Sequence, residues 1–562
     1  MKSIITTTIL TALLPVVAHA ATPVIPGTGD LLQQMQPAKP VVPSSTEPAL
    51  EIQHKKTAPL PDSGSFLVKK IVLSGNTLFD TGTLHALVAD AEGTQVTLPQ
   101  LQGLALRITE YYRQHDYAFA RAYIPPQTLS DSVKIEIIEA RYGNIKLDNQ
   151  SGVSDNLINA TLAPLHAGDA INRTEMDRAL LLLSDIPGLS AHAILKPGEQ
   201  VGQSDLQIGT AAAPAATGNL TLDNFGNHYI GRPRVGLSAN LINPLHHGDI
   251  VTVNASTSGD GMRYGRFAYD TLLNGQGTRI GAAYSVLLYK LGEELQALNA
   301  HGMAQVVSAW GKHPLIRSRN LNLNGQIQYD RMMLRDQVDV SQLRTFRHLD
   351  GATATLSGDM RDSLLSGGLN TWKLDWTGGS VNFDDAAAQT VDAATAKTQG
   401  WYTLWNLNLA RLQGLSKRDA LYVSFTGQWA RKNLDSSKKM LVGGPYTVRA
   451  YDVGAVSADT GYIGTAELRH ELKFGGFGHF QTVAFIDSAH VTINQNTWIN
   501  STNRATLSGA GLGLTWYAPR FGRTNSTQLT VQTYVATPFG PTPSLVGKTN
   551  SVRGWMEMSL RY

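Results

Sequence analysis

The sequence predicts a transmembrane β-barrel of about 16 antiparallel strands, preceded by two small α+β domains and by an N-terminal helix on a linker. Two observations lead to this fold class. From residue 217 to the C-terminus, apolar and polar residues alternate in short runs, as they do in a β-strand with two different faces. Before that region, helical and extended patterns follow each other twice in the same order.

The alternating runs favour a barrel over a soluble sandwich. Their polar positions are mostly Asn, Gln, Ser and Thr, in runs such as 235–241, 251–256, 321–329, 405–409, 421–429 and 556–562. Uncharged polar side chains suit a water-filled lumen, whereas the outer face of a soluble sheet is usually charged. An open sheet edge would leave backbone groups unpaired in hydrocarbon, so we expect residues 211–562 to close into a barrel.

Composition excludes several classes of function. The 562 residues include 47 Lys and Arg against 44 Asp and Glu, and this balance does not indicate a nucleic-acid partner. The absence of cysteine excludes disulfides, thiolate metal sites and a cysteine nucleophile. No HExxH, GxSxG or GxxxxGK[ST] pattern occurs. We therefore expect no enzyme, no catalytic residue, no cofactor and no metal site.

The N-terminus predicts export and a tethered helix. Residues 1–20 combine Lys2, an apolar run and a small-x-small cleavage site, which is typical of a secretory signal peptide. Residues 21–64 are rich in Pro, Ser and Thr and read as an extended linker. Within the linker, a short helix is predicted over residues 30–36, and its candidate plug residues are Asp30 as the N-cap, Leu31, Leu32 and Met35. The alternative is a terminus without function.

Two small domains follow, each with the order β-α-α-β-β. In residues 65–142, a capping box begins at Thr97, and apolar residues then recur at helical spacing. Residues 143–210 repeat the order, with a second capping pattern at Asn172. Tandem copies of one unit suggest binding modules rather than an enzyme fold.

A long loop at about residues 441–462 interrupts the barrel pattern. It contains Gly443 and Gly444, and then a single cation, Arg449, among apolar and aromatic neighbours. Long structured loops are usually functional. A planar guanidinium suits bidentate bonding to a carboxylate, and Asp487 lies in the second alternating run after the loop. The alternative is a solvated loop with no fixed partner.

These residues resemble the outer-membrane transporters of two-partner secretion systems, of the haemolysin-activator or filamentous-haemagglutinin-transporter type, within the barrel-assembly superfamily. The resemblance covers nearly the whole mature chain. The runs that carry it are residues 75–77, 121–127, 180–208 and 222–235, the tip sequence Val448, Arg449, Ala450 and Tyr451, and the wall sequence Phe485, Asp487 and Ala489.

The resemblance implies a role for each part. The two small domains correspond to periplasmic POTRA domains, and residues 441–462 correspond to a lid loop that folds back into the barrel. The lid-loop motif is Val448, Arg449, Ala450, Tyr451 and Asp452, and its partner on the barrel wall is formed by Phe485 and Asp487. Members of the family usually carry Gly at the positions of Ala450 and Ala489. Gly adopts positive φ at little cost, whereas Ala does not, so the backbone conformation of the tip does not follow from the family pattern.

The implied function is translocation of a large secreted exoprotein across the bacterial outer membrane. The POTRA domains would bind the unfolded cargo by β-augmentation, and the barrel lumen would pass it. We expect a monomer in outer-membrane lipid. Two alternatives remain, namely an assembly factor that inserts other barrels and a passive porin.

Overall fold

The computed structural model describes residues 26–35, 49–52, 64–128, 132–522, 526–546 and 550–562. The predicted signal peptide and most of the linker lie outside the described residues. Among the described residues, no helix is long and apolar enough to cross a membrane.

The first small unit combines a three-stranded sheet with a long helix. Its elements are β2 Phe66–Val68, β3 Lys70–Ser74, α2 Thr81–Ala86, β4 Thr94–Val96, α3 Leu98–Gln114, β5 Arg121–Tyr123 and β6 Ser132–Ile138. Its strands pair in the order β3-β6-β5, with β2 and β4 as a separate pair. The capping pattern at Thr97 starts α3, and the buried face of α3 packs against the sheet in one apolar core.

The second unit repeats this order of elements. It contains β7 Arg141–Gln150, α4 Asp155–Leu162, α5 Arg173–Ser184, β8 Leu189–Pro197 and β9 Gln203–Ala212. A segment of the linker, β1 Ala49–Ile52, joins this sheet and pairs in parallel with β8, giving the order β1-β8-β9-β7. One edge of the second unit is therefore covered by residues from the same chain.

The predicted closed antiparallel barrel is confirmed, with sixteen strands. The strands are β10 Ala216–Asp223, β11 Arg234–Ile242, β12 Ile250–Thr257, β13 Met262–Leu272, β14 Arg279–Lys290, β15 Ala300–Arg317, β16 Leu321–Val338, β17 Leu343–Asp362, β18 Gly368–Phe383, β19 Gly400–Gly414, β20 Asp419–Ala430, β23 Thr460–Lys473, β24 His479–Thr492, β25 Arg504–Tyr517, β26 Gln528–Pro538 and β27 Arg553–Arg561. Pairing of β10 with β27 closes the wall.

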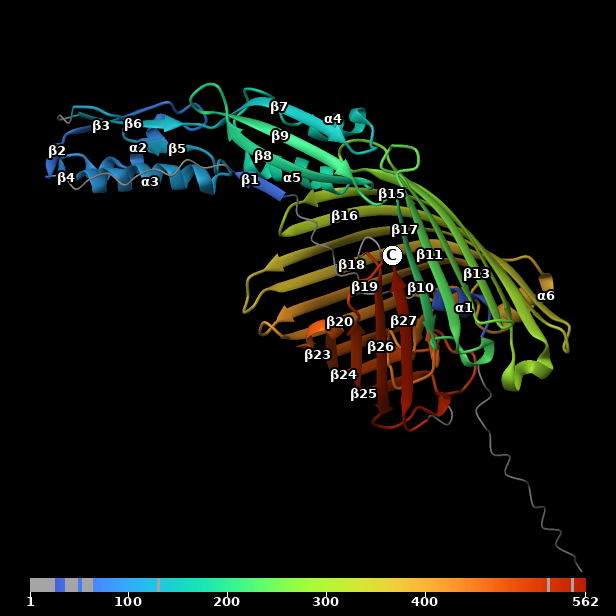
Figure 1. The fold of residues 1–562 in the computed structure, drawn as a ribbon. Coiled ribbons are helices and arrows are strands. Elements are labelled where there is room, and N and C mark those ends of the chain that lie inside the picture. The colour runs from blue at the N-terminus through green and yellow to red at the C-terminus, as the bar shows by residue number, and fades with distance from the viewer. Residues whose placement is uncertain (1–25, 36–48, 53–63, 129–131, 523–525, 547–549) are drawn as a thin grey trace, which may run out of the picture.

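The wall is uneven in height. Strands β15 to β18 have 16 to 20 residues, whereas β10, β11, β12 and β27 have 8 or 9. Figure 1 shows the long strands reaching well beyond the short ones. Because β27 closes onto β10, the short strands lie together around the closure.

The two ends of the barrel differ. At one end, here called the domain end, the turns between strands contact the second unit. Arg317 and Arg319, in and after β15, bind Asp185 and Asp177 of the second unit through paired hydrogen bonds. At the other end, here called the loop end, the connections are longer and include α6 Ala386–Ala394.

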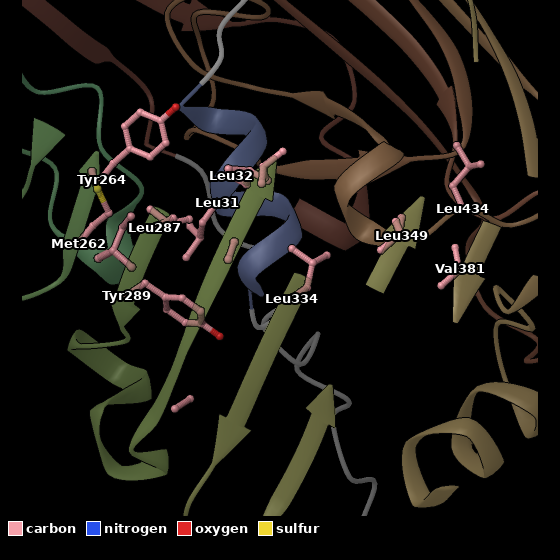
Figure 2. Packing of buried hydrophobic residues seen from close by; sticks show 14 of the residues in the cluster. Leu31, Leu32, Met262, Tyr264, Leu287, Tyr289, Leu334, Leu349, Val381 and Leu434 are labelled. Atoms are coloured by element: carbon pink, nitrogen blue, oxygen red, sulfur yellow. The ribbon is translucent and has the colours of Figure 1, made fainter. Parts of the chain in front are cut away.

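Inside the barrel lies a short helix, α1 Thr28–Gln34 (Figure 1). It packs against apolar side chains that point inward from the barrel strands, and Figure 2 shows Leu31 and Leu32 among them. The labelled wall residues include Leu287, Tyr289 and Leu334. The lumen is therefore apolar where α1 sits, although the alternating pattern predicted a polar lumen throughout.

Candidate functional site

The long loop folds back into the barrel as a hairpin. Its arms are β21 Met440–Val442 and β22 Val456–Ala458, which pair with each other and not with the wall. The turn into the tip needs glycine, because Gly443 and Gly444 have φ of +102° and +108°. A Cβ at Gly443 would also collide with the carbonyl oxygen of Asp452. We call residues 443–455 the lid tip.

Arg449 of the lid tip bonds Asp487 on β24. The Arg449 Nε donates to Asp487 Oδ2 at 2.8 Å, and Nη2 donates to Oδ1 at 2.7 Å. The backbone N–H of Arg449 donates to the same carboxylate at 3.1 Å. Both side chains are buried, with exposed fractions of 4% for Arg449 and 0% for Asp487. Although burial lowers the pKa of Arg449, the bonds and charge of Asp487 raise it above its usual value.

A second carboxylate completes this site. Arg449 Nη1 donates to Glu467 Oε1 at 2.7 Å, and the other oxygen of Glu467 accepts from Arg469. The ring of Phe485 lies 3.4 Å from Arg449 Cζ, within cation–π distance. Phe485 was predicted from the sequence as part of this site, whereas Glu467 and Arg469 were not. Their two-residue spacing on β23 placed them on one face, but nothing marked that face as the partner of the lid.

The two alanines at usual glycine positions cause no backbone strain. Neither Ala450 nor Ala489 has positive φ. The methyl group of Ala450 is accommodated by Gly509 on β25, where an added Cβ would collide with it. Gly509 therefore supplies the space that the lid tip needs, and no sequence signal pointed to it.

The remaining tip residues hold the lid in place. Val448 and Tyr451 are buried in the apolar cluster that joins the lid to β23, β24 and β25. Asp452 is half-exposed and bonds Arg553 at the start of β27 through both of its oxygens, at 2.6 and 2.8 Å. Residues that precede and residues that follow Arg449 in the sequence therefore both contact the wall.

The helix α1 begins earlier than predicted. Its N-cap is Gly27 and not Asp30, so that prediction is wrong. Asp30 is the third helical residue, and its carboxylate lies 3.4 Å from the N–H of Gly27. Thr28 takes the first helical position because its N–H and hydroxyl both donate to Asp336 on β16, at 2.8 and 2.9 Å. Met35, the predicted last apolar contact, packs half-buried against the same cluster as Leu31 and Leu32.

One chain of charges links α1 to the base of the lid. Asp336, which holds Thr28, also accepts from Arg347 on β17 at 2.8 Å. Arg347 is buried and bonds Asp435 just before β21. Gln33 donates to the carbonyl oxygen of Ser436 at 3.0 Å. The helix and the lid therefore share one set of supports.

The carboxylate of Asp30 is buried between α1 and the lid, which is unfavourable for its charged form. Ser457 on the returning arm of the lid donates to its carboxylate at 3.1 Å. Burial raises the pKa of Asp30 to about 6, the nearby charge of Asp435 adds to the rise, and the N–H of Gly27, the Ser457 hydroxyl and the Arg347 guanidinium oppose it. A carboxylate that resists ionisation weakens the docking of α1 at neutral pH.

Polar space remains in the lumen. Cavities of about 860 and 570 Å³ lie beside the lid tip and beside α1. The larger is bounded by Arg449 and Glu467 and by amide and hydroxyl side chains of the wall such as Gln326, Thr355 and Asn406. Among the residues that the structure describes, no cluster of His, Asp and Glu side chains is arranged to hold a metal ion.

Comparison with known proteins gives consistent matches. Residues 202–516 match the haemolysin secretion/activation protein family ShlB/FhaC/HecB, and residues 66–140 match the ShlB-type POTRA domain. The chain is 28% identical over 457 residues to the heme/hemopexin transporter protein HuxB of Haemophilus influenzae, with 80% of each chain covered. It is 23% identical over 466 residues to the outer membrane transporter CdiB of Dickeya dadantii, again with 80% of each covered.

A solved structure matches as well. CdiB from Escherichia coli superposes with a TM-score of 0.70 and 17% identity, covering 95% of this chain and 96% of that one. At this identity the match shows the fold alone.

Proposed function

The chain belongs to the haemolysin secretion/activation protein family ShlB/FhaC/HecB, and from this premise we propose how its lumen opens. We propose that α1 is a plug that leaves the lumen when cargo passes, and that the lid stays docked. The protein is an outer-membrane translocator of two-partner secretion, with its POTRA domains in the periplasm. Its partner is a secreted protein that passes through the barrel lumen. The domain end of the barrel is thus periplasmic, and the loop end is extracellular.

The observation that carries this proposal is the way α1 is held. The helix has seven residues, too few to be stable outside a packed environment. It is held by two buried leucines and by bonds to Asp336, and it carries a carboxylate whose ionisation opposes docking. Such an element can undock without unfolding the wall. A passive porin would have no use for an internal obstruction of this kind.

We assign residues 143–210 to a second POTRA domain. The repeated β-α-α-β-β order supports this assignment. Cargo that binds by adding a strand to a sheet needs an open edge, and β1 already covers the β8 edge of this domain. Cargo would either displace β1 or bind another edge. Displacement of β1 would pull on the linker that joins it to α1.

The remaining partners follow from the surface of the barrel. Outward-facing apolar side chains such as Leu237, Phe267 and Tyr284 are about half exposed, and they would contact lipid. We propose a monomer, because one chain closes the wall. The assembly factor shares this fold, but the family match supports secretion of a partner protein.

Secretion of a co-expressed partner tests the function. The partner for this test is a large secreted protein from a neighbouring gene, where one is found, and the readout is its amount in the culture medium. Deletion of residues 65–210 should abolish secretion while the barrel still assembles in the outer membrane. Undiminished secretion by that variant would refute the role of the POTRA domains.

A further inference from the structure

The closure between the first and last strands is the shortest pairing in the wall. Strands β10 and β27 share five paired positions, whereas β10 and β11 share eight and β26 and β27 share nine. On the opposite side, β16 and β17 share eighteen. We call the β10–β27 pairing the seam. Few backbone bonds hold it, although an open edge in hydrocarbon is costly.

Asn224 extends the seam toward the loop end through its backbone, whose N–H donates to the carbonyl oxygen of Met556 at 3.2 Å, and through its side chain. Beyond the last pair, Asn224 donates to the carbonyl oxygen of Gly554 at 3.1 Å and accepts from the N–H of Met556 at 2.9 Å. Beyond Asn224, the chain leaves β10, whereas β27 continues toward the loop end as far as Arg553 and is paired there with β26. Any further bonding across the seam has to come from another element.

The lid tip supplies that bonding through Asp452. On one side of the seam, Asp452 bonds Arg553 of β27 through both oxygens. On the other side, Arg232, in the loop that follows β10, donates to the same carboxylate at 2.9 Å. Bidentate Arg–carboxylate pairs are strong, and the Arg553 side chain is only 6% exposed. One carboxylate of the lid thus holds an arginine from each side.

Neighbouring contacts repeat the arrangement. On the β27 side, Trp555 Nε1 donates to the carbonyl oxygen of Arg449 at 2.7 Å. On the β10 side, Asn227 donates to the carbonyl oxygen of Val453 at 3.2 Å. The ring of Phe225 lies 5.9 Å from Trp555 and makes an edge contact with it across the seam. The lid tip therefore touches the β27 side through Arg449 and Asp452, and it touches the β10 side through Asp452 and Val453.

We propose that the lid tip is a clasp that keeps the extracellular end of the β10–β27 seam shut, with Asp452 as its central bridge. The wall stays closed as long as the lid stays docked. Removal of the Asp452 charge leaves Arg553 buried without its partner and frees Arg232, so the seam opens from its loop end. This role depends on the geometry of the lid and not on the identity of the cargo.

Hydrogen exchange tests the clasp. Full-length protein is reconstituted in nanodiscs, and backbone exchange is measured for peptides from β10, β27 and β16. In Asp452→Asn, exchange in β10 and β27 should be roughly tenfold faster, because local opening governs the exchange rate, while β16 is unchanged. The matched control is Asp362→Asn, which breaks a bidentate pair with Arg411 at the domain end of the barrel. It should leave β10 and β27 unchanged.

A second variant tests the proposal in case Asp452→Asn does not assemble in the membrane. Arg232→Gln keeps the buried pair between Asp452 and Arg553, and it should accelerate exchange in β10 by a smaller factor. A cysteine pair at Leu222 and Met558, which face each other across the seam, should restore protection in the otherwise cysteine-free chain. Unchanged exchange at the seam in both variants, or an equal rise in β16, would overturn the proposal.

Discussion

The two elements inside this barrel are held in opposite ways. The plug α1 lies against the long strands and is held by buried leucines, by hydrogen bonds from Thr28 to Asp336, and by single hydrogen bonds with Ser436 and Ser457 of the loop that carries the lid. The lid tip lies against β24, β25 and β27, and it is held by an arginine with two buried carboxylate partners. The two leucines contribute about 3–6 kcal/mol together, and removing one partner from a buried ion pair costs about 3–5 kcal/mol. The two elements therefore differ in the kind of contact: ionisation of Asp30 opposes docking of α1, whereas Arg449 is paired with two carboxylates in the docked lid. Under the proposed function, α1 leaves the lumen during secretion and the lid stays docked.

The largest expected effect is at the lid. Asp487→Ala should lower the free energy of unfolding by about 3–5 kcal/mol, because it leaves the Arg449 guanidinium without its main partner in a buried site. Samples are incubated at increasing temperatures and then run on a gel that keeps the barrel folded. The measurement is the temperature at which the band of the folded barrel disappears. Asp419→Ala, which removes an exposed partner of His470, is the control and should have little effect. An equal loss in both variants would remove the distinction between the lid and the surface.

The next effect concerns the space for Ala450. Gly509→Ala should destabilise the docked lid by about 1–3 kcal/mol, because its new methyl group meets the Ala450 methyl group. The double variant with Ala450→Gly should recover most of the loss, since the two methyl groups no longer compete. Additive losses in the double variant would show that the two sites are not in contact.

A smaller effect is expected at the plug. Thr28→Val removes the hydroxyl that donates to the Asp336 carboxylate, a bond worth about 1.5 kcal/mol, and keeps the Asp336–Arg347 pair of the wall; it should raise the undocked fraction of α1 roughly tenfold. Single-channel recordings should show more frequent opening with the same thermal stability of the wall. Thr355→Val, which removes a hydroxyl that donates to Asp375 within the wall, is the control. A drop in thermal stability without more openings would contradict the weak-plug account.

The smallest effect is a dependence on pH. The docked pKa of Asp30 is about 6 and its ordinary value is 3.8, so docking favours the protonated form. Docking is therefore strongest below pH 4 and weakens as the pH rises through 6. Channel openings should become more frequent between about pH 4 and pH 6 and level off above that, and Asp30→Asn should flatten this dependence. A steeper dependence in Asp30→Asn would indicate another titrating group.

The sequence predicted the features that have a local pattern, and it did not predict the features that depend on contacts between distant parts of the chain. Alternation with period two predicts the strands and the closed wall, because each strand carries its own signal. It cannot say that the lumen is apolar around Leu334 and Leu349, since that depends on where a distant helix docks. Arg449 and Asp487 were predicted as partners from a guanidinium in an apolar loop and from the family motifs.

The missed residues have no such signal. Gly509 matters because of one methyl group on a loop far away in the chain. Glu467 reads as an ordinary acidic residue until the fold brings Arg449 to it. Asp452 was expected in the lid-loop motif, but nothing in the sequence pointed to Arg553 as its partner. The cap of α1 was misassigned because Asp30 satisfies the capping pattern from either position, and only the contact of Thr28 with Asp336 decides between them.

Cysteine labelling during secretion tests the difference between plug and lid most directly. In the cysteine-free chain, Leu31→Cys and Val448→Cys each place one thiol at a position with no exposed surface at rest. Cells that secrete the partner protein are treated with a maleimide, and labelling is compared with cells that lack the partner. We expect cargo to accelerate labelling at position 31 and to leave position 448 protected. Equal labelling at both positions, or protection of position 31 during secretion, would contradict the account.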